Sequence, residues 1–463
     1  MRKLLLLIVG IVFLVSCTKD FLSLKRDMKN VVPQSLEDFQ ALMDNSAVIN
    51  LNSAYLLGEI GAGDFYLKDE TWNALSSPWV KNAYNWQADI FQGSQSDIWN
   101  RMYEKILYCN IVLEGLERNK NDIHDIQGYN DLRGQALFWR SYSFYQLAQF
   151  FCAVYDKQNL EGRIGLPLRL ESDIDQKVGQ STLLQTYNQI VVNLLEAENL
   201  LKEEKPIIFG VYFKSRPSKI ALRALLSRIY LQMQEYVKAK EYAQKVLTMQ
   251  SQLLDFNQVP VKPVKEYTFD IFGSTNPEVL LYDVMFYNSV IAQSRLIVDS
   301  VLLRSYEVND LRKARFFTST NGVDTTFRGS YNGNVDLHGF VTLSEVYLIL
   351  AESSVRENDI IRAKEIMNVF LSNRYANSTI KDISSLEKSA LLNFILQERK
   401  KELVFRGVRW QDLRRLNLEP EFETTITRKI EGISYKLLPK SQKYIYPLPD
   451  DEVILNGYKQ VER

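Results

Sequence analysis

The sequence predicts a mostly α-helical protein in which paired helices form the scaffold, with long irregular loop excursions and a few short strands. Apolar residues recur at three- and four-residue steps over most of the 463 residues, which is the period of amphipathic helices. Strand signals are limited to short runs such as residues 279–282. Together these patterns favour a single α-helical domain over residues 35–463.

The first 34 residues differ from this body. Residues 1–16 combine a basic start, an apolar run and a small last residue, which is typical of a secretory signal peptide. The run is shorter than the roughly 20 residues that span a bilayer. Leu14-Val15-Ser16-Cys17 resembles the lipobox of bacterial lipoproteins. We therefore expect Cys17 to carry lipid, including palmitate, and residues 17–34 to form a tether.

Side chains with capping potential mark the starts of several predicted helices. Ser35 precedes the first helix, and Thr182 with Gln185 has the spacing of a capping box. The same spacing occurs in Thr342 with Glu345 and in Ser384 with Glu387. Beyond the first helix, the predicted helices cover residues 97–118, 129–151, 183–201, 220–233, 236–247, 343–355, 359–370, 386–406 and 408–418.

Two predicted helix pairs share a spacing of small residues. Ser227 and Ala239 are twelve residues apart in one pair, as are Ala351 and Ala363 in the other. This spacing resembles the tetratricopeptide repeat, in which small residues let antiparallel helices approach closely. One pair cannot bury both of its faces, so we expect several pairs to stack.

Two stretches, residues 58–93 and 251–340, do not follow the helical period. The first holds Trp72, Trp79 and Trp86 among glycine and polar residues, and is predicted as a long, ordered loop region. The second contains prolines and Asn-Gly turn signals, with a short strand expected at 279–282. Its many aromatic residues favour an excursion packed onto the helices over a disordered linker.

Composition excludes several functional classes. The chain has 56 Lys and Arg against 56 Asp and Glu, so it lacks the basic excess of a nucleic-acid partner. With two histidines far apart, a metal site or a histidine-based catalytic triad is not expected, and no cofactor motif is present. Cys109 and Cys152 lie in helical, aromatic-rich stretches, which favours two buried thiols over a disulfide.

Four segments resemble the SusD/RagB family of surface lipoproteins from Bacteroidetes nutrient-uptake systems. Asp20-Phe21-Leu22 follows the lipobox, and residues 343–352 read LSEVYLILAE. Residues 397–415 read QERKKELVFRGVRWQDLRR, the most specific match, and Tyr446-Pro447-Leu448-Pro449 is followed by Glu452. The family often has Glu at the place of Arg406 and Arg at the places of Lys400 and Lys401. The resemblance covers essentially the whole mature chain.

The resemblance implies a SusD-like helical fold with a tetratricopeptide-like scaffold. It also implies a binding protein on the outer-membrane surface that acts as a lid on a SusC-like TonB-dependent transporter. Such proteins capture glycan or oligopeptide for the transporter, and the sequence leaves these two ligand classes open. The acidic and basic residues of 397–415, at one-turn spacing, are expected to form ion pairs that hold the fold.

Sugars present apolar faces framed by hydroxyl groups, which suits aromatic rings beside amides and carboxylates. The predicted ligand-binding residues are Asp64, Tyr66, Trp72, Trp79, Tyr84 and Trp86, helped by Tyr331, Asn332 and Asn334 of the excursion. The alternative is that these aromatic residues only pack the loop. A glycoside hydrolase, which needs two carboxylates about 5 to 10 Å apart, and a helical adaptor for protein partners are the other classes. No catalytic residue is expected.

Overall fold

The computed structural model describes residues 33–202, 214–271, 275–292, 295–319, 321–377, 379 and 381–463. The predicted signal peptide, Cys17 and nearly all of the tether lie outside these residues. They therefore stay predictions.

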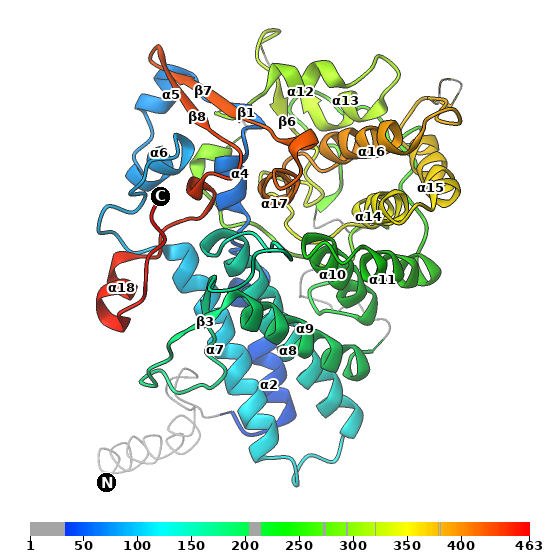
Figure 1. Ribbon diagram of the computed structural model, residues 1–463. Helices are drawn as coiled ribbons and strands as arrows, with labels where there is room; N and C mark the ends of the chain where they lie inside the picture. The colour runs from blue at the N-terminus through cyan, green and yellow to red at the C-terminus, as the bar shows by residue number, and fades with distance from the viewer. Residues whose placement is uncertain are drawn as a thin grey trace, which may run out of the picture.

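The fold is mostly α-helical, as predicted (Figure 1). In the lower part of the molecule, as drawn in Figure 1, the helix α8 (Ile126–Phe151) lies between α7 (Asp97–Arg118) and α9 (Leu183–Leu200). The short helix α2 (Leu36–Met43) packs on α7 and α8. Nearly every side chain of α8 from its first turn onward is buried, because neighbouring elements cover it on all sides.

The two predicted helix pairs are confirmed and they stack. One pair is α10 (Lys219–Gln232) with α11 (Tyr236–Met249), and the other is α14 (Leu343–Arg356) with α15 (Ile360–Ser372). The helix α16 (Lys388–Glu402) packs beside the second pair. Contacts run from α10 to α11, on to α14, and from α14 to both α15 and α16. Ala239, Ala351 and Ala363 are fully buried at these contacts, where their small size lets the helix backbones approach.

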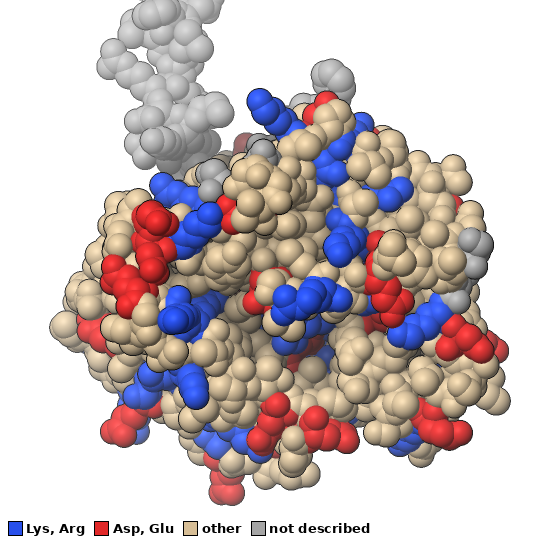
Figure 2. Space-filling view, turned by 90° about the horizontal axis from the view of Figure 1, so that it is seen from above, with Lys and Arg blue, Asp and Glu red and all other residues tan. Residues whose placement is uncertain are grey.

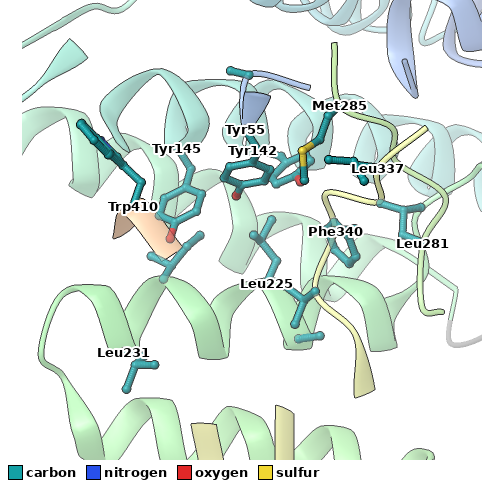
Figure 3. Packing of buried hydrophobic residues seen from close by; sticks show 14 of the residues in the cluster. Tyr55, Tyr142, Tyr145, Leu225, Leu231, Leu281, Met285, Leu337, Phe340 and Trp410 are labelled. Atoms are coloured by element: carbon teal, nitrogen blue, oxygen red, sulfur yellow. The ribbon is translucent and has the colours of Figure 1, made fainter. Parts of the chain in front are cut away.

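A belt of buried phenols joins the lower helices to the repeat-like pairs (Figure 3). The ring of Tyr142 on α8 lies 5.3 Å from Phe340 and 6.2 Å from Tyr55. Its hydroxyl donates to Asp283 over 2.9 Å, and the hydroxyl of Tyr145 donates to Gln411 over 2.9 Å. Each phenol thus buries a large apolar ring without leaving its polar end unpaired.

Residues 58–93 contain more regular structure than predicted. The structure has α4 (Leu56–Ala62), β1 (Phe65–Tyr66), α5 (Asp69–Asn73) and α6 (Pro78–Tyr84) in this part of the chain. The expectation of a long loop region was wrong here because helices of five to seven residues are too short to show an apolar repeat. A further short helix, α3 (Ser46–Ile49), precedes them.

The excursion packs on the helical stack, as expected, with Phe316, Phe317 and Phe327 buried. Its elements are η3 (Ser289–Ile291), β4 (Ile297–Val298), α12 (Ser300–Ser305), α13 (Leu311–Phe316), β5 (Phe317–Thr318) and β6 (Thr326–Phe327). β1 pairs antiparallel with β4, which ties the two irregular stretches together. The strand predicted at 279–282 was wrong, because Val279 makes only an isolated bridge, to Thr342.

The remaining elements are short. They are β2 (Ile164–Pro167), β3 (Gln180–Thr182), α17 (Arg409–Leu416), η4 (Pro420–Phe422), β7 (Ile426–Ile430), β8 (Ile433–Leu437), η5 (Gln442–Tyr444) and α18 (Asp450–Asn456). β2 pairs with β3 and β7 with β8, both antiparallel. None of the helices in the described residues is long and apolar enough to cross a membrane.

Three of the four predicted caps form, one of them without the second hydrogen bond of a capping box, and the fourth does not. Ser35 caps α2, and Thr182 with Gln185 makes a complete capping box at α9. Thr342 accepts from the Glu345 amide, but the Glu345 carboxylate is drawn to buried arginines instead of closing the box. The cap by Ser384 was wrong, because α16 begins later, at Lys388. Cys109 and Cys152 are free and buried, as expected.

The charged run 397–415 is confirmed as a set of buried ion pairs. Glu398 accepts from Arg312 over 2.5 Å, and Glu402 accepts from Arg374 over 3.0 Å. Arg399 bridges Glu345 and Asp412, while Arg415 bridges Glu352 and Asp412. These pairs join α14, α16, α17 and the excursion into one body.

Candidate functional site

An exposed corner of the molecule carries two of the predicted aromatic residues. Tyr66 ends β1 with 42% of its surface exposed, and Trp72 lies partly exposed on α5. In Figure 1 these elements lie at the upper left, beside the tip of the β7–β8 hairpin. We call Tyr66 and Trp72, with their polar neighbours Lys68, Asn73, Asp324 and Glu431, the aromatic corner.

Trp72 is held from below by α6. Its ring lies 5.6 Å from the ring of buried Tyr84, and the Lys81 ammonium is 5.7 Å from its centre. The Tyr84 hydroxyl accepts a hydrogen bond from the Leu67 amide over 3.0 Å. Tyr84 and Lys81 therefore hold one side of the Trp72 ring, and the rest of the ring is partly exposed.

Polar groups flank the two rings. The Lys68 ammonium lies 2.7 Å from an Asp324 carboxylate oxygen, in the turn between β5 and β6. The Asn73 amide donates to Glu431 over 2.9 Å, which ties α5 to the turn of the β7–β8 hairpin. Aromatic surface framed by amide, ammonium and carboxylate groups offers both stacking and hydrogen bonding to a ligand.

Buried charges lie beneath the corner. The Arg428 guanidinium is 3.8 Å from the Tyr84 ring centre and 4.8 Å from that of Trp86. Burial lowers the pKa of Arg428 and raises the pKa of Asp64. The Arg409 Nε lies 3.8 Å from an Asp64 carboxylate oxygen. These groups stiffen the support of the corner.

Five of the predicted site residues are buried and pack inside the protein: Asp64, Tyr84, Trp86, Tyr331 and Asn332. The Tyr331 ring lies 3.5 Å below the Arg406 guanidinium, and its hydroxyl donates to Glu278 over 2.8 Å. The Trp86 indole donates to a backbone carbonyl of α4. In this structure these side chains support the surface, and a ligand contact by any of them stays a prediction.

Trp79 and Asn334 are partly exposed but lie elsewhere. Trp79 borders a small cavity with Phe91 and Gln95, and Asn334 borders another in the excursion. In the part of the chain that the structure describes, no hydrogen bond or ring contact joins either residue to Tyr66 or Trp72. The structure thus leaves Tyr66 exposed and Trp72 partly exposed beside polar side chains that sequence reasoning did not name.

The face that carries the corner is hollowed and charged. Figure 2 shows this face from above, with Lys and Arg side chains gathered around its middle. A pocket of about 300 Å³ between α12 and α16 is lined by Lys400, Phe394 and Val301, among others. Burial and the charge of Arg409 lower the pKa of Lys400. This pocket was missed because the sequence around Lys400 resembles a purely structural ion-paired run.

A buried carboxyl group near the corner makes stability depend on pH. Glu59 on α4 accepts from the Gly407 amide over 2.6 Å. Burial, and then the charge of Asp64, raise the pKa of Glu59 from its ordinary 4.5 to about 8. The unfolded chain loses this proton near pH 4.5, whereas the folded protein keeps it to about pH 8. Stability therefore falls as pH rises through this window, and levels off above it.

Glu59→Gln is expected to remove this loss of stability. The amide stays neutral at every pH and its oxygen can still accept from Gly407. The difference in unfolding free energy between Glu59→Gln and the wild type should shift in favour of the variant by about 2 kcal/mol between pH 5 and pH 7. Urea unfolding at four pH values measures it, with exposed Glu70→Gln on α5 as the control. Parallel pH profiles for Glu59→Gln and the wild type would contradict the expectation.

The described residues hold no group of three or more His, Cys, Asp or Glu side chains placed to bind a metal ion. The exposed rings and polar groups of the corner suit an organic ligand with mixed apolar and polar surface.

Comparison with solved structures shows the same fold in Bacteroides proteins. A SusD superfamily protein from Bacteroides thetaiotaomicron matches with a TM-score of 0.73 and 21% identity, over 93% of this chain and 100% of that one. A putative sugar binding protein from Bacteroides vulgatus gives 0.74 and 20%, over 93% and 99%. A SusD-like carbohydrate binding protein from the same species gives 0.66 and 18%, over 92% and 97%.

Comparison with curated protein sequences finds no significant match. Two family models do match the chain. One, described as "Starch-binding associating with outer membrane", matches residues 20–231, and the other, described as "SusD family", matches residues 323–461. The two matches together span most of the sequence, so the chain belongs to the SusD/RagB family.

Proposed function

We propose that this protein is a lipid-anchored binding protein on the cell surface of the outer membrane. It captures glycan at the aromatic corner and delivers it to a SusC-like TonB-dependent transporter. Membership of the SusD/RagB family supports this assignment, as do fold relatives described as sugar or carbohydrate binding proteins. Cys17 provides the anchor, and the protein carries out no catalytic turnover.

The observation that carries the proposal is the pairing of Tyr66 and Trp72 with polar side chains on one exposed surface. A pyranose ring has apolar C–H faces that stack on an aromatic plane, and its hydroxyl groups both donate and accept hydrogen bonds. Asn73 and Glu431 supply an amide and a carboxylate beside the rings. The Trp72 ring is already held by Tyr84 and Lys81, which lowers the entropy lost when a ligand binds.

Trp72→Ala is expected to weaken glycan binding about fivefold to tenfold. This corresponds to about 1.0–1.4 kcal/mol, which lies within the 0.5–1.5 kcal/mol expected of an aromatic contact. Isothermal titration with oligosaccharides prepared from plant and host polysaccharides measures the affinity. Trp79→Ala is the matched control, because Trp79 is also partly exposed but borders a different cavity.

Three results would speak against the proposed site or ligand. Equal affinity in the wild type and Trp72→Ala, with both folded, would remove the aromatic corner. A loss confined to Trp79→Ala would move the site to α6. Binding of oligopeptides but of no oligosaccharide would make the protein a peptide-binding member of its family. Circular dichroism and thermal unfolding of both variants provide the folding control.

A further inference from the structure

A pocket of about 340 Å³ lies between α7, the β2–β3 connection and the C-terminal segment. We call it the α7 pocket. Trp99 and Tyr103 of α7 form one wall, Arg169 of the β2–β3 connection forms the second, and Glu452 and Tyr458 of the C-terminal segment form the third. It shares no lining residue with the aromatic corner.

The second wall is fixed to α7 by side-chain hydrogen bonds. The Tyr103 hydroxyl donates to the Pro167 carbonyl over 3.0 Å. The Asn110 amide donates to the carbonyls of Arg169 and Glu171 over 3.1 and 2.9 Å. These bonds tie the connection to α7 and so fix the position of the second wall.

The third wall is fixed to the β2–β3 connection and β3. The Tyr458 hydroxyl donates to the Val178 carbonyl over 2.9 Å. The Lys459 amide donates to the Gln180 side chain over 2.7 Å, and that side chain donates back to the Lys459 carbonyl. Three segments distant in sequence thus form a pre-organised pocket, which lowers the ordering cost of binding.

The lining combines the two surfaces that a saccharide presents. Trp99 and Tyr103 pack with their ring centres 4.8 Å apart, and Phe151 holds Trp99 from behind at 4.9 Å. Tyr103 is partly exposed and gives the pocket an aromatic surface. Asn100 and Glu104 on the same helix, with Glu452 opposite, supply amide and carboxylate groups. This matches a ring with apolar faces and a rim of hydroxyl groups.

Size and charge narrow the ligand class. Ligand pockets are usually about 300–1,000 Å³, so this one suits a mono- or disaccharide unit. Its charged lining residues are Glu104, Glu171, Asp173 and Glu452 against the single cation Arg169. The excess of negative charge disfavours uronic acids and sulfated sugars.

We propose that the α7 pocket is a second saccharide-binding site, specific for a neutral sugar unit and separate from the aromatic corner. This inference rests on the proposed function only in taking saccharides as ligands. A second site on a fixed body would let one glycan chain be held at two points and so raise the overall avidity.

Asn100→Trp tests the site by placing a large side chain at the opening of the pocket. Asn100 is exposed, and its side chain makes no hydrogen bond within the described ranges, so the substitution leaves the fold intact. The matched control is Asn121→Trp, at an exposed asparagine just beyond the other end of α7. The probes are cellobiose, lactose and maltose, each titrated to about 20 mM, with digalacturonate as the anionic probe.

We expect at least one neutral disaccharide to bind the wild type with a Kd on the order of 1 mM. Asn100→Trp should weaken this binding at least about tenfold, or by about 1.4 kcal/mol, whereas Asn121→Trp and Trp72→Ala should leave it unchanged. Digalacturonate should bind more weakly than the neutral sugars. Saturation-transfer NMR should place the bound sugar against aromatic protons, and Asn100→Trp should abolish that transfer.

Several results would overturn the site. One is that no neutral probe binds the wild type; another is that Asn100→Trp binds as the wild type does. Tighter binding of digalacturonate than of the neutral sugars would overturn the assigned specificity. If Trp72→Ala alone abolishes disaccharide binding, the aromatic corner is supported and the α7 pocket falls. If Asn100→Trp alone abolishes both disaccharide and longer-oligosaccharide binding, the α7 pocket stands and the aromatic corner falls.

Discussion

Replacing Arg374 by methionine is expected to lower the free energy of unfolding by about 3–5 kcal/mol. Arg374 is fully buried between the end of α15 and the excursion. Its guanidinium donates to Glu402 over 3.0 Å, to Glu278 over 2.6 Å and to the Leu254 carbonyl over 2.8 Å. Methionine fills similar volume but leaves both carboxylates with less compensating charge in a dry interior.

The measurement is urea unfolding followed by circular dichroism at neutral pH. The control is Arg362→Met on α15, where a partly exposed arginine pairs with exposed Glu365 over 3.1 Å and donates to Gln244 over 3.0 Å. That pair should contribute only about 0–1 kcal/mol. A loss below about 1 kcal/mol in Arg374→Met would show that the buried network tolerates a missing cation. The charged run would then have a smaller structural role than its contacts indicate.

Gly407→Ala is expected to destabilise the protein by about 2–5 kcal/mol. Gly407 lies between α16 and α17 with φ of +76°, a left-handed conformation that costs other residues roughly 1–2 kcal/mol. A Cβ atom there would lie 2.4 Å from the Cβ of Tyr55, so the backbone must move. That movement would also disturb the hydrogen bond from the Gly407 amide to Glu59.

Gly432→Ala separates the two causes. Gly432, in the β7–β8 turn, has φ of +81°, but a Cβ atom there would meet nothing within 4 Å. This control should lose only the roughly 1–2 kcal/mol of left-handed strain. Thermal unfolding of both variants measures the difference, which reports the close approach of Gly407 to Tyr55. Equal destabilisation in the two variants would show that the clash is relieved without cost.

Local sequence signals were sufficient for the long helices. The prediction of 97–118 has the same bounds as α7, and the predicted pairs agree with α10, α11, α14 and α15 to within about two residues at each end. The apolar period and the capping residues are properties of a short stretch of sequence, so they can be recognised without knowing the fold. The short helices α4, α5 and α6 were missed because they are shaped by packing against α17 and the hairpin, not by an apolar repeat of their own.

The candidate site was harder to predict. Tyr66 and Trp86 look alike in sequence, as aromatic residues among polar ones, yet Tyr66 is exposed and Trp86 is buried beside Arg428. The side chains of Asp324 and Glu431 join the corner from more than 250 residues away. Trp99 and Tyr103 lie within the predicted helix 97–118, and only packing of the β2–β3 connection and the C-terminal segment beside them forms a pocket.

The sequence by itself determined the helical architecture, the repeat-like pairs, the structural role of the charged run and the resemblance to the SusD/RagB family. These features follow from the apolar period, the capping residues and the sequence motifs, all of which depend on residues that are close together in the sequence. The tertiary structure alone decided which aromatic rings reach solvent and which carboxylates find a cation. Burial and charge pairing depend on segments far apart in the chain, so the surfaces offered to a ligand exist only once those segments are packed together.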